Sequence, residues 1–116
     1  MEQSSETKAA LKQVKIKTGV VTRGQKEYSS YQKEANQLQA KLDQFKAEDA
    51  DEGKIRQAND ALAETLQMLP ICKQKLVDGV AGLEAVMTPV EELQEAEEVV
   101  AANAAISAAQ EFLKTI

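Results

Sequence analysis

The fold is indicated by residues 11–45, LKQVKIKTGVVTRGQKEYSSYQKEANQLQAKLDQF. Apolar or small side chains recur there in alternating steps of three and four residues: Leu11, Val14, Thr18, Val21, Gln25 and Tyr28, then Tyr31, Ala35, Leu38, Leu42 and Phe45. That spacing places the side chains on one face of a long helix and predicts a seam packed against neighbouring helices. The step from Tyr28 to Tyr31 is three residues where the alternation requires four. We therefore expect the seam to shift register near Tyr31.

A polar turn follows this helix, and the seam then resumes. In the turn 48–53, Asp49 or Asp51 can accept hydrogen bonds from the free amides that open a second helix. The seam continues through Ile55, Ala58, Leu62, Leu66, Leu69, Cys72 or Lys73, Leu76, Val80 and Leu83. These patterns predict helices at about 5–48 and 52–87.

The run Thr88-Pro89-Val90-Glu91 is the clearest sign of a third helix. Thr88 can act as N-cap, Pro89 suits the first helical position, and Glu91 can complete a capping box. The run predicts a third helix at about 89–114, with Val90, Leu93, Val100 and Ala104 on one line.

Three helices joined by short connections pack as antiparallel neighbours. We therefore expect an all-α fold and a single domain over 1–116: an elongated antiparallel three-helix bundle, a spectrin-like rod. Pro70 lies inside the second helix, where it removes one backbone hydrogen bond, so we expect a kink there. The third helix should cover only the half of the rod distant from the first turn, which leaves the tip, about 38–62, as the more mobile part.

The composition argues against enzymatic chemistry. The chain has no histidine and one cysteine, Cys72, so the commonest general base is absent, as is a paired-cysteine zinc motif. No phosphate-cradling glycine pattern occurs. We expect no catalytic residues, no cofactor and no metal. A lone cysteine, the lack of an opening charged-then-apolar segment and the lack of a long apolar run together predict a cytoplasmic protein.

Charge is distributed unevenly along the chain. Residues 1–48 hold nine Lys or Arg against six acids, whereas residues 89–116 hold one against six. The acidic residues of the third helix should lie level with the basic residues of the first: Glu91, Glu92, Glu95, Glu97 and Glu98 beside Lys12, Lys15, Lys17 and Arg23. We favour such an internal charge match over a nucleic-acid-binding patch, because the chain is acidic overall and the basic stretch has no interleaved aromatic residues.

Three motifs carry a resemblance to a known family. They are Val14-Lys-Ile-Lys-Thr-Gly-Val-Val-Thr-Arg23; Tyr31 with Lys33, Glu34 and Ala35; and Met68, Pro70, Cys72 and Leu76. With these motifs, residues 14–76 resemble the tubulin-binding cofactor A family. Ile71 and Lys75 depart from its pattern, which usually has an acidic residue and Arg there.

The resemblance implies a cytoplasmic, cytoskeleton-associated chaperone that captures β-tubulin folding intermediates released by the chaperonin and supports αβ-tubulin assembly by non-catalytic binding. Other tubulin-folding cofactors are implied as possible partners, and neither nucleic acid nor membrane is expected. The matching motifs supply the candidate contacts Lys15, Lys17, Arg23, Tyr31, Lys33 and Glu34.

A different hypothesis is a structural coiled-coil adaptor that dimerises through the tip seam, which comprises Leu38, Leu42, Phe45, Ile55 and Leu62. The chain is accordingly expected to be a monomer or a weak homodimer. Binding of the basic first helix to a membrane surface is disfavoured, because its apolar stripe lacks bulky aromatic residues.

Overall fold

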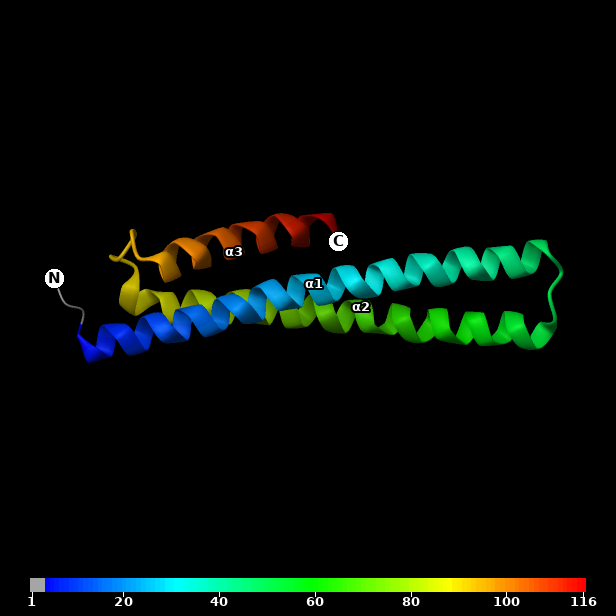
Figure 1. The fold of residues 1–116 in the computed structure, drawn as a ribbon, viewed down its shortest axis with the longest axis horizontal. Helices are drawn as coiled ribbons and strands as arrows, with labels where there is room; N and C mark the ends of the chain where they lie inside the picture. Colours follow the sequence, from blue (N-terminus) through cyan, green and yellow to red (C-terminus); the bar gives the residue numbers. More distant parts are fainter. Residues whose placement is uncertain (1–3) are drawn as a thin grey trace. The chain divides into compact units, whose positions relative to one another are not determined.

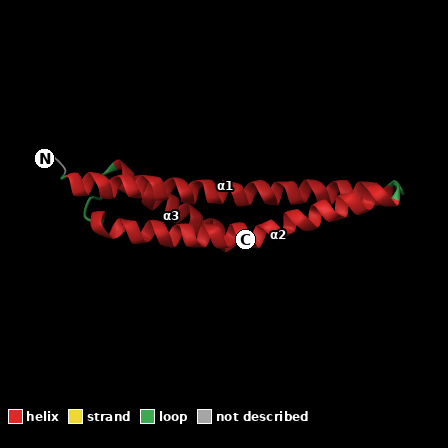
Figure 2. Cartoon of the chain, turned by 90° about the horizontal axis from the view of Figure 1, so that it is seen from below, coloured by secondary structure: helices red, strands yellow, loops and turns green. Residues whose placement is uncertain are grey.

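The computed structural model describes residues 4–116, and these are almost entirely helical (Figures 1 and 2). The described chain forms α1 (Ser5–Ala47), α2 (Glu52–Met87), a short 3₁₀ helix η1 (Thr88–Val90) and α3 (Glu97–Thr115). No strand occurs among these residues. The all-α, three-helix prediction is confirmed.

The helices contribute to two compact units. The three-helix unit comprises the described residues up to Gln25 together with Gln74–Ile116, and the hairpin unit comprises Lys26–Lys73. Both α1 and α2 therefore supply residues to each unit, whereas α3 belongs to the three-helix unit alone.

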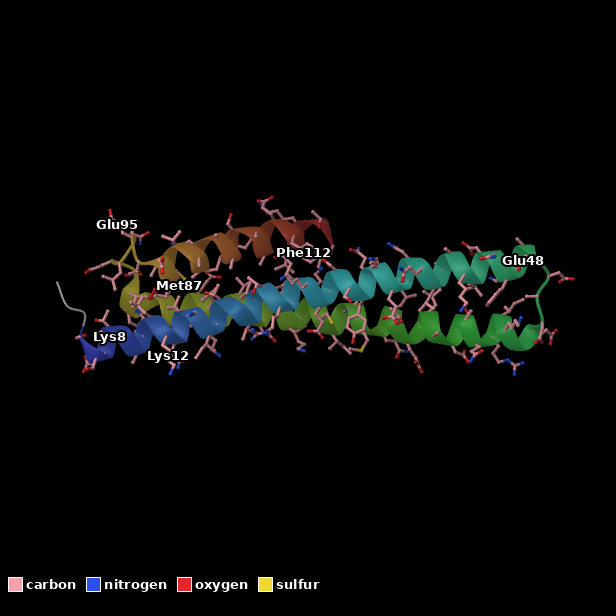
Figure 3. The ribbon with its side chains drawn as sticks, viewed as in Figure 1. Lys8, Lys12, Glu48, Met87, Glu95 and Phe112 are labelled. Atoms are coloured by element: carbon pink, nitrogen blue, oxygen red, sulfur yellow. The ribbon has the colours of Figure 1, made fainter. Side chains whose placement is uncertain are left out.

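In the three-helix unit, α3 lies alongside α1 and α2 (Figure 1). Its core consists of Leu11, Val14, Val21, Leu76, Val80, Leu83, Val90, Val99, Ala102, Ala105 and Ala109. The buried face of α3 consists of Val99 and three alanines, and such small side chains allow the helix axes to approach closely. Phe112, near the end of α3, is half-buried and packs against this core (Figure 3).

The hairpin unit has a smaller core made by two helices. Ala35 and Leu42 of α1 pack with Ala58 and Leu62 of α2, and half-buried Leu38, Phe45 and Ile55 surround them. Because two of the four buried residues are alanines, this core contains much less apolar volume than that of the three-helix unit.

Burial along α1 explains the expected register shift. A central line of side chains is buried throughout at strict seven-residue spacing: Val14, Val21, Tyr28, Ala35 and Leu42. A second line is half-buried throughout, again at sevens: Ala10, Lys17, Gly24, Tyr31, Leu38 and Phe45. A third line is buried or half-buried at Leu11, Thr18 and Gln25 but exposed at Gln32, Gln39 and Lys46.

The seven-residue repeat of α1 is thus not interrupted at Tyr31. The expected seam passes from the third line to the second line at that residue. The first two lines meet α2, as the close approach of Gly24 to Leu76 shows, and the third line loses its cover in the hairpin unit, to which α3 contributes no residue. The change in the pattern therefore reflects the loss of one neighbouring helix.

The turn between α1 and α2 is fixed at both ends. The amide of Ala50 donates to the carbonyl of Phe45 over 2.9 Å and that of Asp49 to the carbonyl of Lys46 over 3.2 Å, which is a Schellman motif. Asp49 is the residue with positive φ, 53°. Asp51 accepts from the amide of Gly53 over 3.0 Å and so provides the predicted side-chain cap of α2.

The third helix begins at Glu97 rather than at about residue 89. Residues 88–90 form η1, whose N-cap is Met87, and no side-chain hydrogen bond caps it, so the predicted Thr88–Glu91 capping box does not form. Val90 is buried, and Leu93 and Ala96 pack against the core. Burial of these apolar side chains in the connection outweighs the local capping signal.

Pro70 lies within α2, whose helical assignment continues on both sides of it. Its missing N–H leaves the carbonyl of Leu66 without a helical donor. Leu66 and Pro70 are both exposed, so water can reach this part of the backbone. The bend at Pro70 stays a prediction.

Candidate partner-binding surfaces

The candidate contact residues predicted from the sequence all lie on α1. No group of three or more His, Cys, Asp or Glu side chains among them is placed to hold a metal ion. No helix in residues 4–116 has the length and apolar character needed to cross a membrane.

The motif Val14–Arg23 builds a distinct outer face on α1. Lys12, Ile16, Gly19 and Arg23 follow one another in steps of four, three and four residues, which places them opposite the buried line of Val14 and Val21. Ile16 is 47% exposed. We call these four residues the outer face; exposed Lys15 and Val20 flank it.

Gly19 makes room on this face for a cation. A Cβ atom placed on Gly19 would lie 2.9 Å from Nη1 of Arg23, so the guanidinium group lies directly over the glycine. The exposed hydrocarbon of Ile16 and the positive charge of Arg23 are thus both presented by the outer face.

Lys15 takes part in a second, shallower feature of the three-helix unit. An open depression of about 280 Å³ is lined by Lys8, Leu11, Lys12 and Lys15 of α1 and by Glu98 in the first turn of α3. Figure 3 labels Lys8 and Lys12 near the start of α1. Three lysines against one glutamate leave this depression positive.

The predicted charge match between α1 and α3 is realised only loosely. Glu98 shares the depression with the lysines, but within residues 4–116 no ion pair joins Lys12, Lys15, Lys17 or Arg23 to the acidic run. Glu91, Glu92 and Glu95 lie in the connection before α3 rather than on a helix. Lys12, Lys15 and Arg23 are therefore exposed and form no ion pair within the described residues.

The six candidate contact residues all lie on α1 but do not form one cluster. Lys15, Arg23, Lys33 and Glu34 are exposed. Lys17 and Tyr31 are half-buried on the second line of α1, fourteen residues apart. Lys15, Lys17 and Arg23 belong to the three-helix unit, whereas Tyr31, Lys33 and Glu34 belong to the hairpin unit.

Comparison with known proteins places this fold and these motifs in one family. Residues 9–106 match the family described as Tubulin binding cofactor A. The chain belongs to the tubulin binding cofactor A family.

Similarity to individual members of the tubulin binding cofactor A family extends over most of the chain. This chain is 42% identical over 88 residues to Tubulin-specific chaperone A of Gallus gallus, and the match covers 76% of this chain and 82% of that protein. It is 34% identical over 89 residues to Tubulin-folding cofactor A of Arabidopsis thaliana, covering 77% and 79%.

Solved structures of the tubulin binding cofactor A family share the fold. The crystal structure of tubulin folding cofactor A from Arabidopsis thaliana superposes with a TM-score of 0.80 at 30% identity, covering 89% of this chain and 97% of that one. Human tubulin chaperone cofactor a superposes with a TM-score of 0.74 at 34% identity, covering 87% and 98%.

Sequence reasoning missed some residues of these surfaces. Lys8 was absent from the predicted basic set, yet its spacing of four and seven residues from Lys12 and Lys15 places all three on one helical face. Ile16 lies inside the recognised motif but outside the seam, and that combination was the available signal for an exposed apolar contact.

Proposed function

We propose that this protein is a chaperone of tubulin folding that captures β-tubulin folding intermediates and supports assembly of the αβ-tubulin dimer. Membership of the tubulin binding cofactor A family and the names of its relatives support this role. The protein acts in the cytoplasm in association with the cytoskeleton, by binding alone. Other tubulin-folding cofactors are its further partners.

The outer face of α1 is the observation that carries the proposal. Its exposed isoleucine is not part of the core, and its cations have no ion-pair partner among the described residues. Ile16 and Val20 lie four residues apart on α1, so their exposed side chains are neighbours, and a contiguous apolar patch rimmed by charge is characteristic of a binding surface. The outer face would cover an apolar part of β-tubulin that is later covered by α-tubulin.

The apolar and the basic side chains of this surface contribute differently to binding. Burying a fully exposed Ile or Val side chain contributes about 1.5–3 kcal/mol, and Ile16 and Val20 are 47% and 39% exposed. Lys15 and Arg23 contribute mainly to the rate and orientation of encounter with an acidic protein such as tubulin. Such an interface binds reversibly, as transfer of a client to later cofactors requires.

The test mixes the protein with newly released β-tubulin and, separately, with α-tubulin, followed by size-exclusion chromatography. The expected result is a complex with β-tubulin alone. The double variant Lys15→Glu/Arg23→Glu should weaken this complex about tenfold or more, a loss of about 1.4 kcal/mol per factor of ten. Lys46→Glu/Arg56→Glu makes the same charge change at exposed positions elsewhere and should have little effect.

Absence of a complex with β-tubulin would refute the proposal, and equal weakening by both double variants would show that net charge rather than the outer face decides binding. Sedimentation of the isolated protein tests the adaptor hypothesis. A tight dimer that ignores tubulin would support an adaptor, whereas a monomer at micromolar concentration would argue against it.

A further inference from the structure

The hairpin unit contains an open groove between α1 and α2. It is lined by Leu38, Lys41 and Phe45 of α1 and by Lys54, Gln57, Ala58 and Ala61 of α2, and it encloses about 400 Å³. We call these residues the hairpin groove. None of them is assigned a role by the proposed function.

The groove exists because large side chains on one helix face small ones on the other. Leu38 and Phe45 lie on the second line of α1 and remain half-buried. Ala58 and Ala61 face them from α2 and fill little of the space between the two helices. Half-buried Leu38, Phe45 and Ala61 therefore leave part of their apolar surface uncovered along the floor of the groove.

The opposite flank of α1 in this unit is polar. Gln32, Gln39 and Lys46 occupy the third line there, and all three are exposed. A partner that buries apolar surface would gain little on that flank of α1. The groove is thus the flank of α1 suited to an apolar contact.

The charged side chains that line the groove are all positive. Its lining contains two lysines and no acidic residue, and neither lysine forms an ion pair within the described residues. Nζ of Lys41 lies 5.6 Å from the ring centroid of Phe45 and so stays beside the groove floor.

The nearest carboxylates on the line of Lys41 are too far away to neutralise it. Glu34 and Glu48 are each seven residues from it, about 10 Å along the helix axis. That separation exceeds the Debye length of about 8 Å at physiological salt. The groove lining thus combines an apolar floor with one lysine from each helix and no acidic residue.

We propose that the hairpin groove binds an acidic amphipathic helix of a partner protein. Apolar side chains of that helix contact Leu38, Phe45 and Ala61, and carboxylates on its two edges pair with Lys41 and Lys54. A groove between two helices accepts the ridge of a third, and flanking charges select the partner. This inference is independent of the proposed function, because it concerns a different surface and requires no tubulin.

The test uses a fluorescent three-heptad peptide with leucine at its two apolar positions and glutamate at its two flanking positions, plus an otherwise identical peptide with lysine in place of glutamate. Fluorescence anisotropy measures binding of each to the full chain. The acidic peptide should bind, and Lys41→Glu/Lys54→Glu should weaken its binding about tenfold or more.

The reversed-charge variant has a positive readout as well: it should bind the lysine peptide, which the original protein should bind poorly. This gain keeps the test informative, because an unfolded variant could not show it. Lys46→Glu/Arg56→Glu carries the same net charge and should bind the acidic peptide as the original protein does. Amide chemical shifts should move at Leu38, Phe45 and Ala61.

Three outcomes would overturn the proposal. The first is no measurable binding of the acidic peptide. The second is equal weakening by the groove variant and its charge-matched control. The third is loss of binding in Lys12→Glu/Lys15→Glu with retention in the groove variant, which would place the site at the lysine depression of the three-helix unit.

Discussion

At the scale of single residues, Gly19 affects both the stability of α1 and the position of Arg23 on its surface. Glycine inside a helix is less favourable than alanine by about 0.5–1 kcal/mol, because it loses more backbone entropy on folding. Gly19 has negative φ, so a side chain causes no backbone strain there. The three heavy atoms nearest to a Cβ atom placed there all belong to the movable end of Arg23.

We therefore expect Gly19→Ala to raise the free energy of unfolding by about 0.5–1 kcal/mol and to displace the guanidinium group of Arg23. Gly82→Ala is the matched control, since a Cβ atom there meets nothing within 4 Å. Urea unfolding should show stabilisation in both variants. Only Gly19→Ala should weaken β-tubulin binding. Equal binding by both variants would show that β-tubulin binding does not depend on the position of the Arg23 guanidinium group.

Cys72 illustrates how a reactive group is made inert by its place in the fold. The side chain is 1% exposed, and its Sγ lies 3.7 Å from Oε1 of Glu27. A thiol reagent needs an accessible sulfur atom, and a side chain this deeply buried is out of its reach in the folded protein.

Labelling of Cys72 by a thiol reagent should therefore be slow in the folded protein and become fast in urea, with the same midpoint as the loss of helical signal. Rapid labelling at low denaturant would show that the hairpin unit opens locally around Cys72 before the chain unfolds.

At the scale of elements, the turn between α1 and α2 shows a conformational cost that a single substitution can remove. Asp49 occupies the left-handed position of the Schellman motif, where glycine is the usual residue. Its side chain makes no hydrogen bond within the described residues. Asp49→Gly should stabilise the protein by about 0.5–2 kcal/mol.

Thermal unfolding measures this effect, with Asp51→Gly as the contrasting variant. Because Asp51 caps α2 through the amide of Gly53, replacing Asp51 by glycine should not raise the melting temperature. A lower melting temperature for Asp49→Gly would mean that the aspartate contributes more to the turn than its backbone conformation costs.

Pro70 is a second residue whose conformational cost a single substitution in α2 can remove. A proline in the interior of a straight helix costs about 3 kcal/mol or more. Where the surrounding helix is already adapted to the proline, replacing it restores only part of that free energy. Pro70→Ala should increase the free energy of unfolding by about 1–3 kcal/mol in urea. Destabilisation would show instead that the packing of α2 depends on the bend.

The extent of α1 and α2 was predictable because their seams are continuous and their shared turn contains acids able to cap. The start of α3 was not, because Thr88 and Glu91 give a capping signal that burial of Val90 overrides. For the candidate contacts, motif matching gave residues that all lie on α1 but not on one face of it, and their role stays a prediction. The fourteen-residue spacing of Lys17 and Tyr31 was the available sign that both lie on the side toward α2.

At the scale of the whole molecule, the two units differ in the apolar surface that stabilises them. The three-helix unit buries large side chains such as Leu76 and Leu83 completely, at 1% and 0% exposure. In the hairpin unit, Leu42 and Leu62 are the only buried leucines among the described residues, and the unit itself contains no third helix. Local stability follows buried apolar contact, so the hairpin unit should open at lower free energy.

Native-state hydrogen exchange tests this difference directly. Amides of residues 38–62 should exchange faster than those of residues 11–21 and 76–83, because opening the hairpin sacrifices only its small core. Leu62→Ala should cost about 2–5 kcal/mol, and this cost should appear as faster exchange in the hairpin unit while protection of the three-helix unit is retained. Leu83→Ala makes the same deletion in the larger core and should lower protection in the three-helix unit. If Leu62→Ala instead lowers protection equally everywhere, the continuous helices α1 and α2 transmit every opening along their length, and the protein unfolds as one cooperative body.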